Sequence, residues 1–145
     1  DIALQSGLAV GATAIIVPEI GFNLQSVIDK ILETQKSGRN HFIIVVSEGL
    51  CDATQLARQL QESTGIETRA TILGHIQRGG NPTLRDRVVA SKMGYAAVEL
   101  LSKGVGNRVV GLKNNKIVNY DIFEALNMSK SFDQETYRLA NTISI

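Results

Sequence analysis

Short runs of branched apolar residues alternate with segments of helical period along this chain, and this alternation constrains the fold most strongly. Residues 14–17 read AIIV and residues 42–46 read FIIVV, as expected for strands covered on both faces. Between these runs, apolar side chains recur on one helical face, at Leu24, Val27, Ile28, Ile31 and Leu32. Strands that alternate with helices favour βαβ units with right-handed crossovers. The sequence therefore predicts an α/β fold, with a mostly parallel sheet between layers of helices.

Cap and turn residues mark the ends of the first helices. Asn23 is the expected N-cap of the helix just described, and Gly38 is its expected stop. Asp52, followed three residues later by glutamine, predicts a second helix that ends at Gly65. Residues 66–73 (IETRATIL) come next and are predicted as a third strand.

Asn81-Pro82 predicts the start of a long helix, because proline is favoured at the first helical position. This helix is expected to run to about Lys103 and to end at Gly104. A short helix is also expected before residue 14, with Gly7 as its weak point. A strand over residues 108–112 is expected to turn at Asn114-Asn115 into a second strand. Short helices are expected near residues 121–127 and 133–141.

Composition excludes several classes of protein. The formal net charge is +1, whereas a general nucleic-acid binder normally carries a strong basic excess. No apolar run approaches the roughly 18 residues of a membrane-spanning helix. Cys51 is the only cysteine, so an intrachain disulfide and a multi-cysteine metal site are both impossible, which fits a cytoplasmic protein. The chain begins with Asp1 and no signal-like segment follows, so we expect it to start inside a longer protein.

Ionisable side chains follow each of the three expected strands. Glu19 comes after the first, Glu48 after the second, and His75 and Arg78 after the third. Ligands of open α/β sheets lie beyond the carboxyl ends of the strands, so these groups are expected at one edge. Paired glycines after Arg78 allow close backbone approach, and the positive end of the helix expected from Pro82 lies nearby. These features predict an anion site, with Glu48 available to accept hydrogen bonds from a sugar.

Each of these residues also has a simpler interpretation. Glu48 is equally consistent with a solvated strand end, and His75 with a side chain that only hydrogen-bonds a backbone carbonyl. Arg85 and Arg87 flank an aspartate on the expected helix and fit a structural or solvated face. His41 fits a surface position, and Cys51 fits an inert core thiol. Residue patterns alone therefore predict an anion-binding α/β module.

The stretch ETRATILGHIQRGGNPTLRDRVVASKMG, residues 67–94, closely resembles the corresponding segment of bacterial 6-phosphofructokinases. Further matches are IIVPE (residues 15–19), LLSKGVGNRVVGLKNNKIV (residues 100–118) and DIFEAL (residues 121–126), which together cover most of the chain. The resemblance implies a Rossmann-like substrate domain plus a segment of the ATP domain. It implies a sugar-phosphate-binding core over residues 1–76, a segment over residues 77–127 that packs on an N-terminal ATP domain, and a returning tail over residues 128–145.

The resemblance also implies a substrate site for fructose 6-phosphate. Glu48 would accept hydrogen bonds from sugar hydroxyls, while His75 and Arg78, with Ile76 and Gln77 between them, would face the 6-phosphate or nearby groups. Arg69 matches the family arginine that reaches the same phosphate from a neighbouring subunit, and the family forms homotetramers. No catalytic or metal-binding residue is expected in this chain.

ATP and magnesium would be bound mainly by an N-terminal half, which in the family also carries the catalytic base. No paired-glycine ATP loop, TIDND-type motif or acidic magnesium cluster occurs in these 145 residues. The resemblance thus implies the C-terminal part of a glycolytic kinase that makes fructose 1,6-bisphosphate, and a chain that is inactive alone. A pyrophosphate-dependent relative and a non-catalytic sugar-phosphate-binding or oligomerisation module are the alternatives.

The family's effector pocket draws on two stretches that differ here. The expected contact residues are Gly11, Ala12 and Thr13 before the first strand, and Ser37, Arg39, Asn40 and His41 before the second. Ser37 and Asn40 replace expected cations, and Thr13 replaces an expected acid. The departure predicts a weak or absent response to a nucleoside diphosphate or phosphoenolpyruvate.

Overall fold

The computed structural model describes residues 1–143 and forms two compact units. The first unit comprises residues 1–72 together with the segment from Phe132 onward, and the second comprises Leu73–Ser131. The first unit contains α1 (Ile2–Ala9), β1 (Ala14–Ile16), α2 (Leu24–Lys36), β2 (Ile44–Val46), α3 (Ala53–Thr64) and α6 (Gln134–Ile143). The second contains the 3₁₀ helix η1 (Gly74–Arg78), α4 (Leu84–Ser102), β3 (Arg108–Lys113), β4 (Lys116–Asp121) and α5 (Ile122–Asn127).

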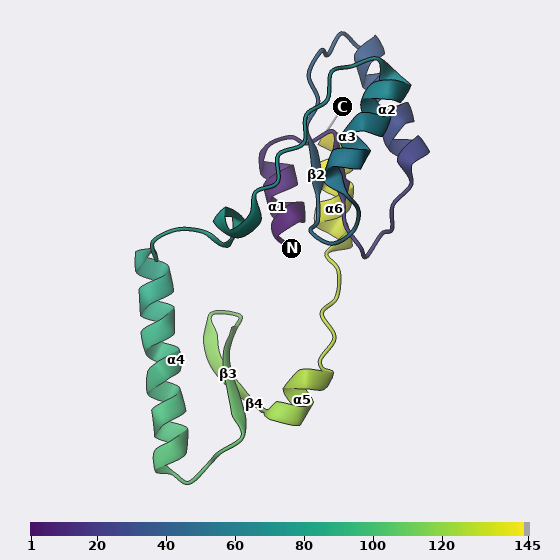
Figure 1. The fold of residues 1–145 in the computed structure, drawn as a ribbon. Helices are drawn as coiled ribbons and strands as arrows, with labels where there is room; N and C mark the ends of the chain where they lie inside the picture. The colour runs from purple at the N-terminus through teal and green to yellow at the C-terminus, as the bar shows by residue number, and fades with distance from the viewer. Residues whose placement is uncertain (144–145) are drawn as a thin grey trace. The chain divides into compact units, whose positions relative to one another are not determined.

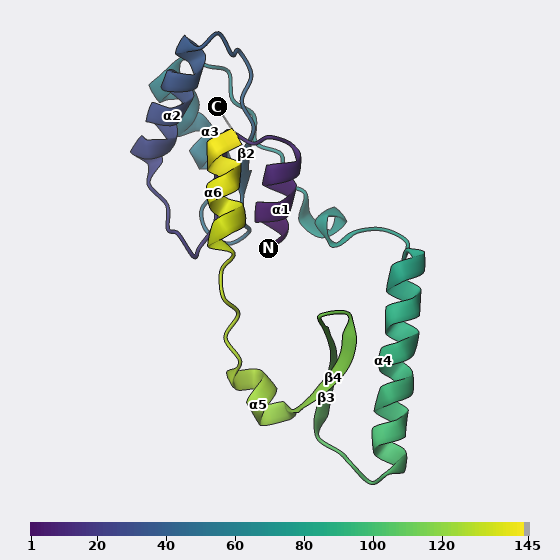
Figure 2. The same ribbon diagram turned by 180° about the vertical axis from the view of Figure 1, so that it is seen from behind.

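The first unit is a sheet between two layers of helices, as the sequence predicts (Figures 1 and 2). β1 and β2 pair in parallel, with Ala14 opposite Ile44 and Ile16 opposite Val46. α2 and α3 cover one face of the sheet, and α1 and α6 cover the other. Parallel strands covered on both faces require apolar residues on both sides, which explains the unbroken AIIV run.

Alternate residues of β1 enter two separate hydrophobic clusters. Ala14 and Ile16 pack with the apolar face of α2 and α3, including Val27 and Leu60. Ile15 lies on the opposite face and packs with Leu4 of α1 and with Ala140 of α6, all of them buried. The two-residue period of a strand thus divides one apolar run between two cores.

Gly7 lies where α1 approaches β1 most closely. A Cβ atom built on Gly7 would lie 2.6 Å from both Cγ1 and Cδ1 of Ile15. Glycine therefore allows the helix to sit against the sheet, and Gly7 is a packing requirement as well as the weak point in helix propensity that the sequence suggested.

The expected caps of α2 and α3 are present. The Asn23 side chain accepts a hydrogen bond from the Ser26 amide at 3.2 Å. The Asp52 carboxylate accepts from the amides of Thr54 and Gln55 at 2.8 and 3.0 Å. Gly65 ends α3 in the left-handed region, with φ of 72°. Both helices therefore begin at the residues that the sequence indicated.

In the second unit, α4 packs on an antiparallel hairpin of β3 and β4. Asn114 and Asn115 turn the hairpin with φ of 50° and 60°, the positive values that a two-residue type I′ turn requires. This turn confirms the sequence prediction. None of the residues 73–131 is buried, so this unit has no closed core of its own.

Three predicted elements differ from the structure. Residues 66–73 form no strand, although side chains 66–69 alternate between half-buried and exposed. A strand needs a hydrogen-bonded neighbour, and within the described residues none pairs with this segment. The long helix begins at Leu84 with Thr83 as its N-cap, not at Asn81-Pro82, because Thr83 and Asp86 form a capping box. β2 is also shorter than predicted and only half-buried.

Candidate functional site

Glu19 and Glu48 follow the carboxyl ends of β1 and β2. The in-register pairing of Ile16 with Val46 brings these ends to the same edge of the sheet, and Ser47 donates its N–H to the Ile16 carbonyl at 2.9 Å. Both glutamates are exposed. The structure therefore presents carboxylates at the edge where open α/β sheets bind their ligands, as predicted for these two strands.

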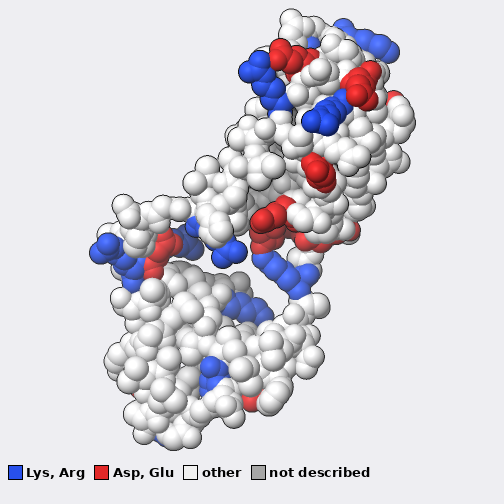
Figure 3. Space-filling view, in the orientation of Figure 1, with Lys and Arg blue, Asp and Glu red and all other residues white. Residues whose placement is uncertain are grey.

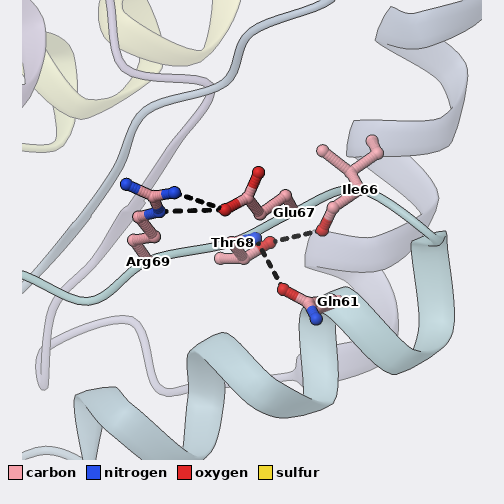
Figure 4. Close-up of polar contacts among 5 residues, drawn as sticks. All are labelled: Gln61, Ile66, Glu67, Thr68 and Arg69. Carbon is pink, nitrogen blue, oxygen red and sulfur yellow. Dashed lines mark hydrogen bonds and ion pairs between the residues drawn. The ribbon is translucent and has the colours of Figure 1, made fainter.

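Arg69 lies on the extended segment after α3 (Figure 4). The Thr68 amide donates to Gln61 Oε1 of α3 at 3.0 Å, and the Thr68 hydroxyl donates to the Ile66 carbonyl at 2.9 Å. Arg69 donates through Nε and Nη2 to one oxygen of Glu67, at 3.0 and 2.6 Å. The two side chains remain 85% and 71% exposed. The segment is thus anchored to α3, while the guanidinium faces solvent with a carboxylate as its local partner.

The basic turn predicted from the sequence is η1. Gly74 precedes His75 with φ of 57°, and Gly79 follows Arg78 with φ of 97°, a pair of values that residues with a Cβ rarely adopt. The Gly79 amide donates to the Ile76 carbonyl at 3.2 Å. The side chains of His75, Ile76 and Arg78 are exposed, and that of Gln77 is half-buried. The structure thus holds the imidazole and the guanidinium on one short turn at the surface.

The N-terminus of α4 already has an anionic partner, which corrects the expectation that it is available to a ligand. Thr83 donates its N–H and its hydroxyl to Asp86 Oδ2, both at 2.8 Å, and accepts from the Asp86 amide at 3.3 Å. These hydrogen bonds lower the pKa of Asp86 below its usual value. A carboxylate of the helix itself therefore already lies at this positive end.

The two stretches proposed for an effector lie before β1 and before β2, and a backbone hydrogen bond joins the first of them to the residue just before β2. Thr13 donates its N–H to the Ile43 carbonyl at 2.8 Å. Thr13 and Ala12 are buried, with exposed fractions of 2% and 3%. The other proposed contacts, Gly11, Ser37, Arg39, Asn40 and His41, are exposed. A threonine held in the core at this position cannot present the carboxylate that the family pattern places there.

Glu48 and Arg69 belong to the first unit, and His75 and Arg78 belong to the second. Their convergence on one ligand stays a prediction. Within the described residues, no group of three or more histidine, cysteine, aspartate or glutamate side chains is placed to hold a metal ion. Over the same residues, no helix has the length and apolarity needed to cross a bilayer.

Comparison with known proteins relates these features to a family. Residues 1–101 match the family model described as phosphofructokinase. This chain belongs to the phosphofructokinase family. The ATP-dependent 6-phosphofructokinase of Alkaliphilus metalliredigens is 52% identical over all 145 residues, and ATP-dependent 6-phosphofructokinase 1 of Clostridium perfringens is 52% identical over 144 residues. The match covers 46% and 45% of these relatives, so the phosphofructokinase chain spans about half their length.

Solved structures of the family share its fold. The phosphofructokinase of Saccharomyces cerevisiae matches 97% of the chain with a TM-score of 0.72 and 28% identity. The T-state crystal structure of Pichia pastoris phosphofructokinase gives the same coverage of the chain, TM-score and identity. The match covers 20% of the Saccharomyces chain and 16% of the Pichia chain.

The phosphofructokinase chain also has a cleft that sequence reasoning missed. Its volume is about 390 Å³, and it runs along β1 beside the start of α2. Lys30 of α2 lines it and donates to Asn141 Oδ1 of α6 at 3.0 Å. Burial lowers the pKa of Lys30. The sequence contained no local signal for this cleft, because residues 111 positions apart form it.

Proposed function

We propose that this chain is the fructose 6-phosphate-binding part of an ATP-dependent 6-phosphofructokinase, which transfers the γ-phosphoryl group of ATP to the sugar phosphate. The observation that carries the proposal is the 52% identity over the whole chain to an enzyme of that name. The exposed Glu48 at the sheet edge and the cationic turn of His75 and Arg78 support it, because a sugar phosphate needs both an acceptor for hydroxyls and cations for phosphate.

In this proposal, His75 and Arg78 contact the phosphate, and Glu48 accepts hydrogen bonds from sugar hydroxyls. Gly79 and Gly80 carry no side chain that would block approach to η1, and a Cβ on either would meet no atom within 4 Å. Arg78 offers a planar fork of donors that matches phosphate oxygens. Ile76 and Gln77 complete the turn that holds the two cationic side chains.

Arg69 serves the site of a neighbouring subunit in a homotetramer. Its side chain is 85% exposed, and its partner Glu67 is a carboxylate two residues away on the same segment. An exposed ion pair of this kind is worth at most about 1 kcal/mol. Arginine can therefore exchange this carboxylate for a phosphate of the adjacent subunit at little cost.

ATP and magnesium are held mainly by the part of the enzyme outside this chain. The relatives are named for ATP and are more than twice as long, and the described residues place no cluster of metal ligands. Phosphoryl transfer depends on the positioning of phosphates and on metal charge, so the chain alone is inactive.

The second unit packs on that missing part through exposed apolar residues of α4, namely Leu84, Val88, Tyr95 and Val98. At 100° per residue, these four residues lie on the face roughly opposite the half-buried residues Val89, Met93 and Leu100. A helix that is apolar on two opposite faces is normally buried between two layers. The visible face of α4 below its charged N-terminal end is mostly uncharged in Figure 3.

The test is a chimera in which the segment of the Alkaliphilus metalliredigens enzyme outside the match is fused to the N-terminus of this chain. We expect the chain alone to show no ATP-dependent phosphorylation of fructose 6-phosphate and the chimera to show it, measured by coupled detection of ADP. Turnover by the chain alone, or a folded chimera that uses fructose 6-phosphate no better than glucose 6-phosphate, contradicts the proposal.

Variants of the chimera test the assigned residues. Arg78→Ala removes a charge-assisted contact worth about 1.5–3 kcal/mol, so KM for fructose 6-phosphate is expected to rise about 10- to 150-fold. Arg58→Ala is the matched control, because Arg58 is an exposed arginine on α3 that has no proposed role. Equal effects of the two substitutions contradict the assignment.

A further inference from the structure

Glu67 holds Arg69 from one side only. The two side chains point toward one another on the extended segment after α3 (Figure 4). Nε of Arg69 donates to Glu67 Oε1 at 3.0 Å, and Nη2 donates to the same oxygen at 2.6 Å. The carboxylate therefore lies on the Nε side of the guanidinium. Within the described residues, the N–H groups of Nη1 and the other hydrogen of Nη2 have no partner.

The backbone that carries this pair is fixed to the rest of the first unit. Ile66 is half-buried and packs against the core formed by α2 and α3. The Thr68 amide donates to Gln61 Oε1 of α3 at 3.0 Å, and Thr68 is also half-buried. Side chains alternate along extended backbone, so the anchored residues lie on one side and the exposed Glu67 and Arg69 on the other. The guanidinium thus projects from a fixed base.

The side-on position of the carboxylate leaves a phosphate-binding end of Arg69 open. Arginine binds phosphate oxygens through two parallel N–H groups of its planar fork. Nη1 and Nη2 form such a fork at the end of the guanidinium that Glu67 does not contact. The ion pair is weak enough to be exchanged for a phosphate, but this geometry does not require the exchange. Glu67 and a phosphate can therefore bind Arg69 at the same time.

We propose that Glu67 is a positioning residue, which orients Arg69 toward the phosphate of fructose 6-phosphate in the neighbouring subunit. Gln61 supports it by fixing the backbone from which both side chains project. A guanidinium that is already oriented loses less side-chain freedom when the phosphate binds. The inference rests on the proposed function, because the phosphate is that of the proposed substrate.

Steady-state kinetics of the chimera with the Alkaliphilus metalliredigens segment test the role of Glu67. Glu67→Ala is expected to raise KM for fructose 6-phosphate by about two- to tenfold, the range for immobilising one long side chain. kcat is expected to stay unchanged, because the phosphate contact is the same before and during phosphoryl transfer to the other end of the sugar. Glu67→Gln keeps an oxygen that accepts from Nε and Nη2, and it is expected to restore most of the affinity.

Two comparisons show whether the effect passes through Arg69. In an Arg69→Ala background, Glu67→Ala is expected to cause no further rise in KM, since residues that act through one contact are not additive. Glu62→Ala is the matched control, because Glu62 is an exposed glutamate of α3 with no proposed role. It is expected to leave KM unchanged.

Gln61→Ala tests the anchor to α3. It removes the acceptor of the Thr68 amide, and Gln61 is exposed, so the core is left intact. KM is expected to rise in the same direction as for Glu67→Ala, and this rise is expected to disappear in the Arg69→Ala background. Gln61→Glu keeps an acceptor oxygen and is expected to behave as the wild type.

Nitrogen-15 relaxation of the Arg69 Nε–H group measures the orientation itself in the chain alone, without any need for activity. The order parameter is expected to be similar in the wild type and in Glu67→Gln, and to fall in Glu67→Ala. All three proteins keep the same core, because both members of the pair are exposed.

Three results overturn the inference. A lower KM in Glu67→Ala shows that Glu67 competes with the phosphate. An Arg69 Nε as mobile in the wild-type chain as in Glu67→Ala, or an equal rise in KM in the Arg69→Ala background, shows that Glu67 does not orient Arg69. An active chimera in which Glu67→Ala leaves KM unchanged overturns this inference alone, whereas a folded chimera that does not use fructose 6-phosphate overturns the proposed function and this inference with it.

Discussion

Replacing Gly7 by alanine tests how closely α1 must approach the sheet. Alanine at an interior helix position is normally favourable, by about 0.8–1 kcal/mol relative to glycine. Here the added Cβ would lie 2.6 Å from two atoms of Ile15, which is 6% exposed. Real carbon atoms do not approach to this distance without contact repulsion, so either the helix or Ile15 must move.

The size of the effect follows from two opposing terms. Forcing an extra methyl group into a packed core costs about 1–3 kcal/mol. One of the two contacting atoms is Cγ1, which is fixed by the χ1 angle of a β-branched side chain, so the upper part of this range applies. After subtraction of the propensity gain, we expect Gly7→Ala to lower the free energy of unfolding by about 1–2 kcal/mol.

Urea unfolding followed by far-UV circular dichroism measures this difference. Gly94→Ala is the matched control, because Gly94 is an interior position of α4 where a Cβ meets no atom within 4 Å. It is expected to stabilise α4 by the propensity term alone. In an Ile15→Ala background the clash is removed, and Gly7→Ala should become stabilising. The packing argument is refuted if Gly7→Ala is as stable as the wild type. It is also refuted if Gly7→Ala lowers the free energy of unfolding by the same amount in the Ile15→Ala background.

Three further outcomes are expected. Gly65→Ala forces a residue with a Cβ into the left-handed C-cap of α3 and should cost about 1–2 kcal/mol of unfolding free energy in the same urea assay. Hydrogen bonds with Thr83 lower the pKa of Asp86, so the ionised Asp86 stabilises α4 fully above the ordinary aspartate pKa, and this stabilisation is lost as pH falls through the lowered pKa. Amide exchange of α4 measured against pH should show the loss. Thr83→Ala should remove most of this pH dependence. Tetramers mixed from chimera subunits with Arg69→Ala and chimera subunits with Arg78→Ala should regain activity, because some sites between subunits then contain both arginines. Mixtures no more active than either variant would place Arg69 in the site of its own subunit.

Local signals in the sequence identified the elements that local interactions determine. α2 and α3 begin at Asn23 and Asp52 because those side chains hydrogen-bond amides of the first turn. The hairpin turns at two asparagines because this residue type tolerates positive φ. Such interactions lie within a few residues of each other and can be read from a single sequence.

The sequence predictions that differ from the structure concern contacts with residues distant in the sequence, or two local signals that compete for the same helix start. Residues 66–73 have the composition of a strand, yet a strand also requires a neighbour. Asn81-Pro82 and Thr83 are overlapping start signals, and Thr83 prevails because Asp86 is placed to complete its capping box. Gly7 was predicted to be a weak point because glycine has low helix propensity. The sequence could not show its contact with Ile15, because that contact depends on how α1 packs on the sheet.

For the candidate site, the sequence correctly placed Glu19 and Glu48 at strand ends, because parallel strands bring their carboxyl ends to one edge. It also identified the surface turn that carries His75 and Arg78. It did not anticipate that Asp86 satisfies the N-terminus of α4, because the start of that helix was placed at Pro82.

The contribution of α6 to the first unit has a consequence for synthesis on the ribosome. α6 supplies Ala140 to the cluster around Leu4 and Ile15, so that layer remains incomplete until α6 has been translated. Residues 73–131 are made in between, and at about 5–20 residues per second this interval lasts several seconds. During that time α1 alone covers this face of the sheet, so the nascent chain exposes the apolar residues that α6 later covers, and chaperones can bind them.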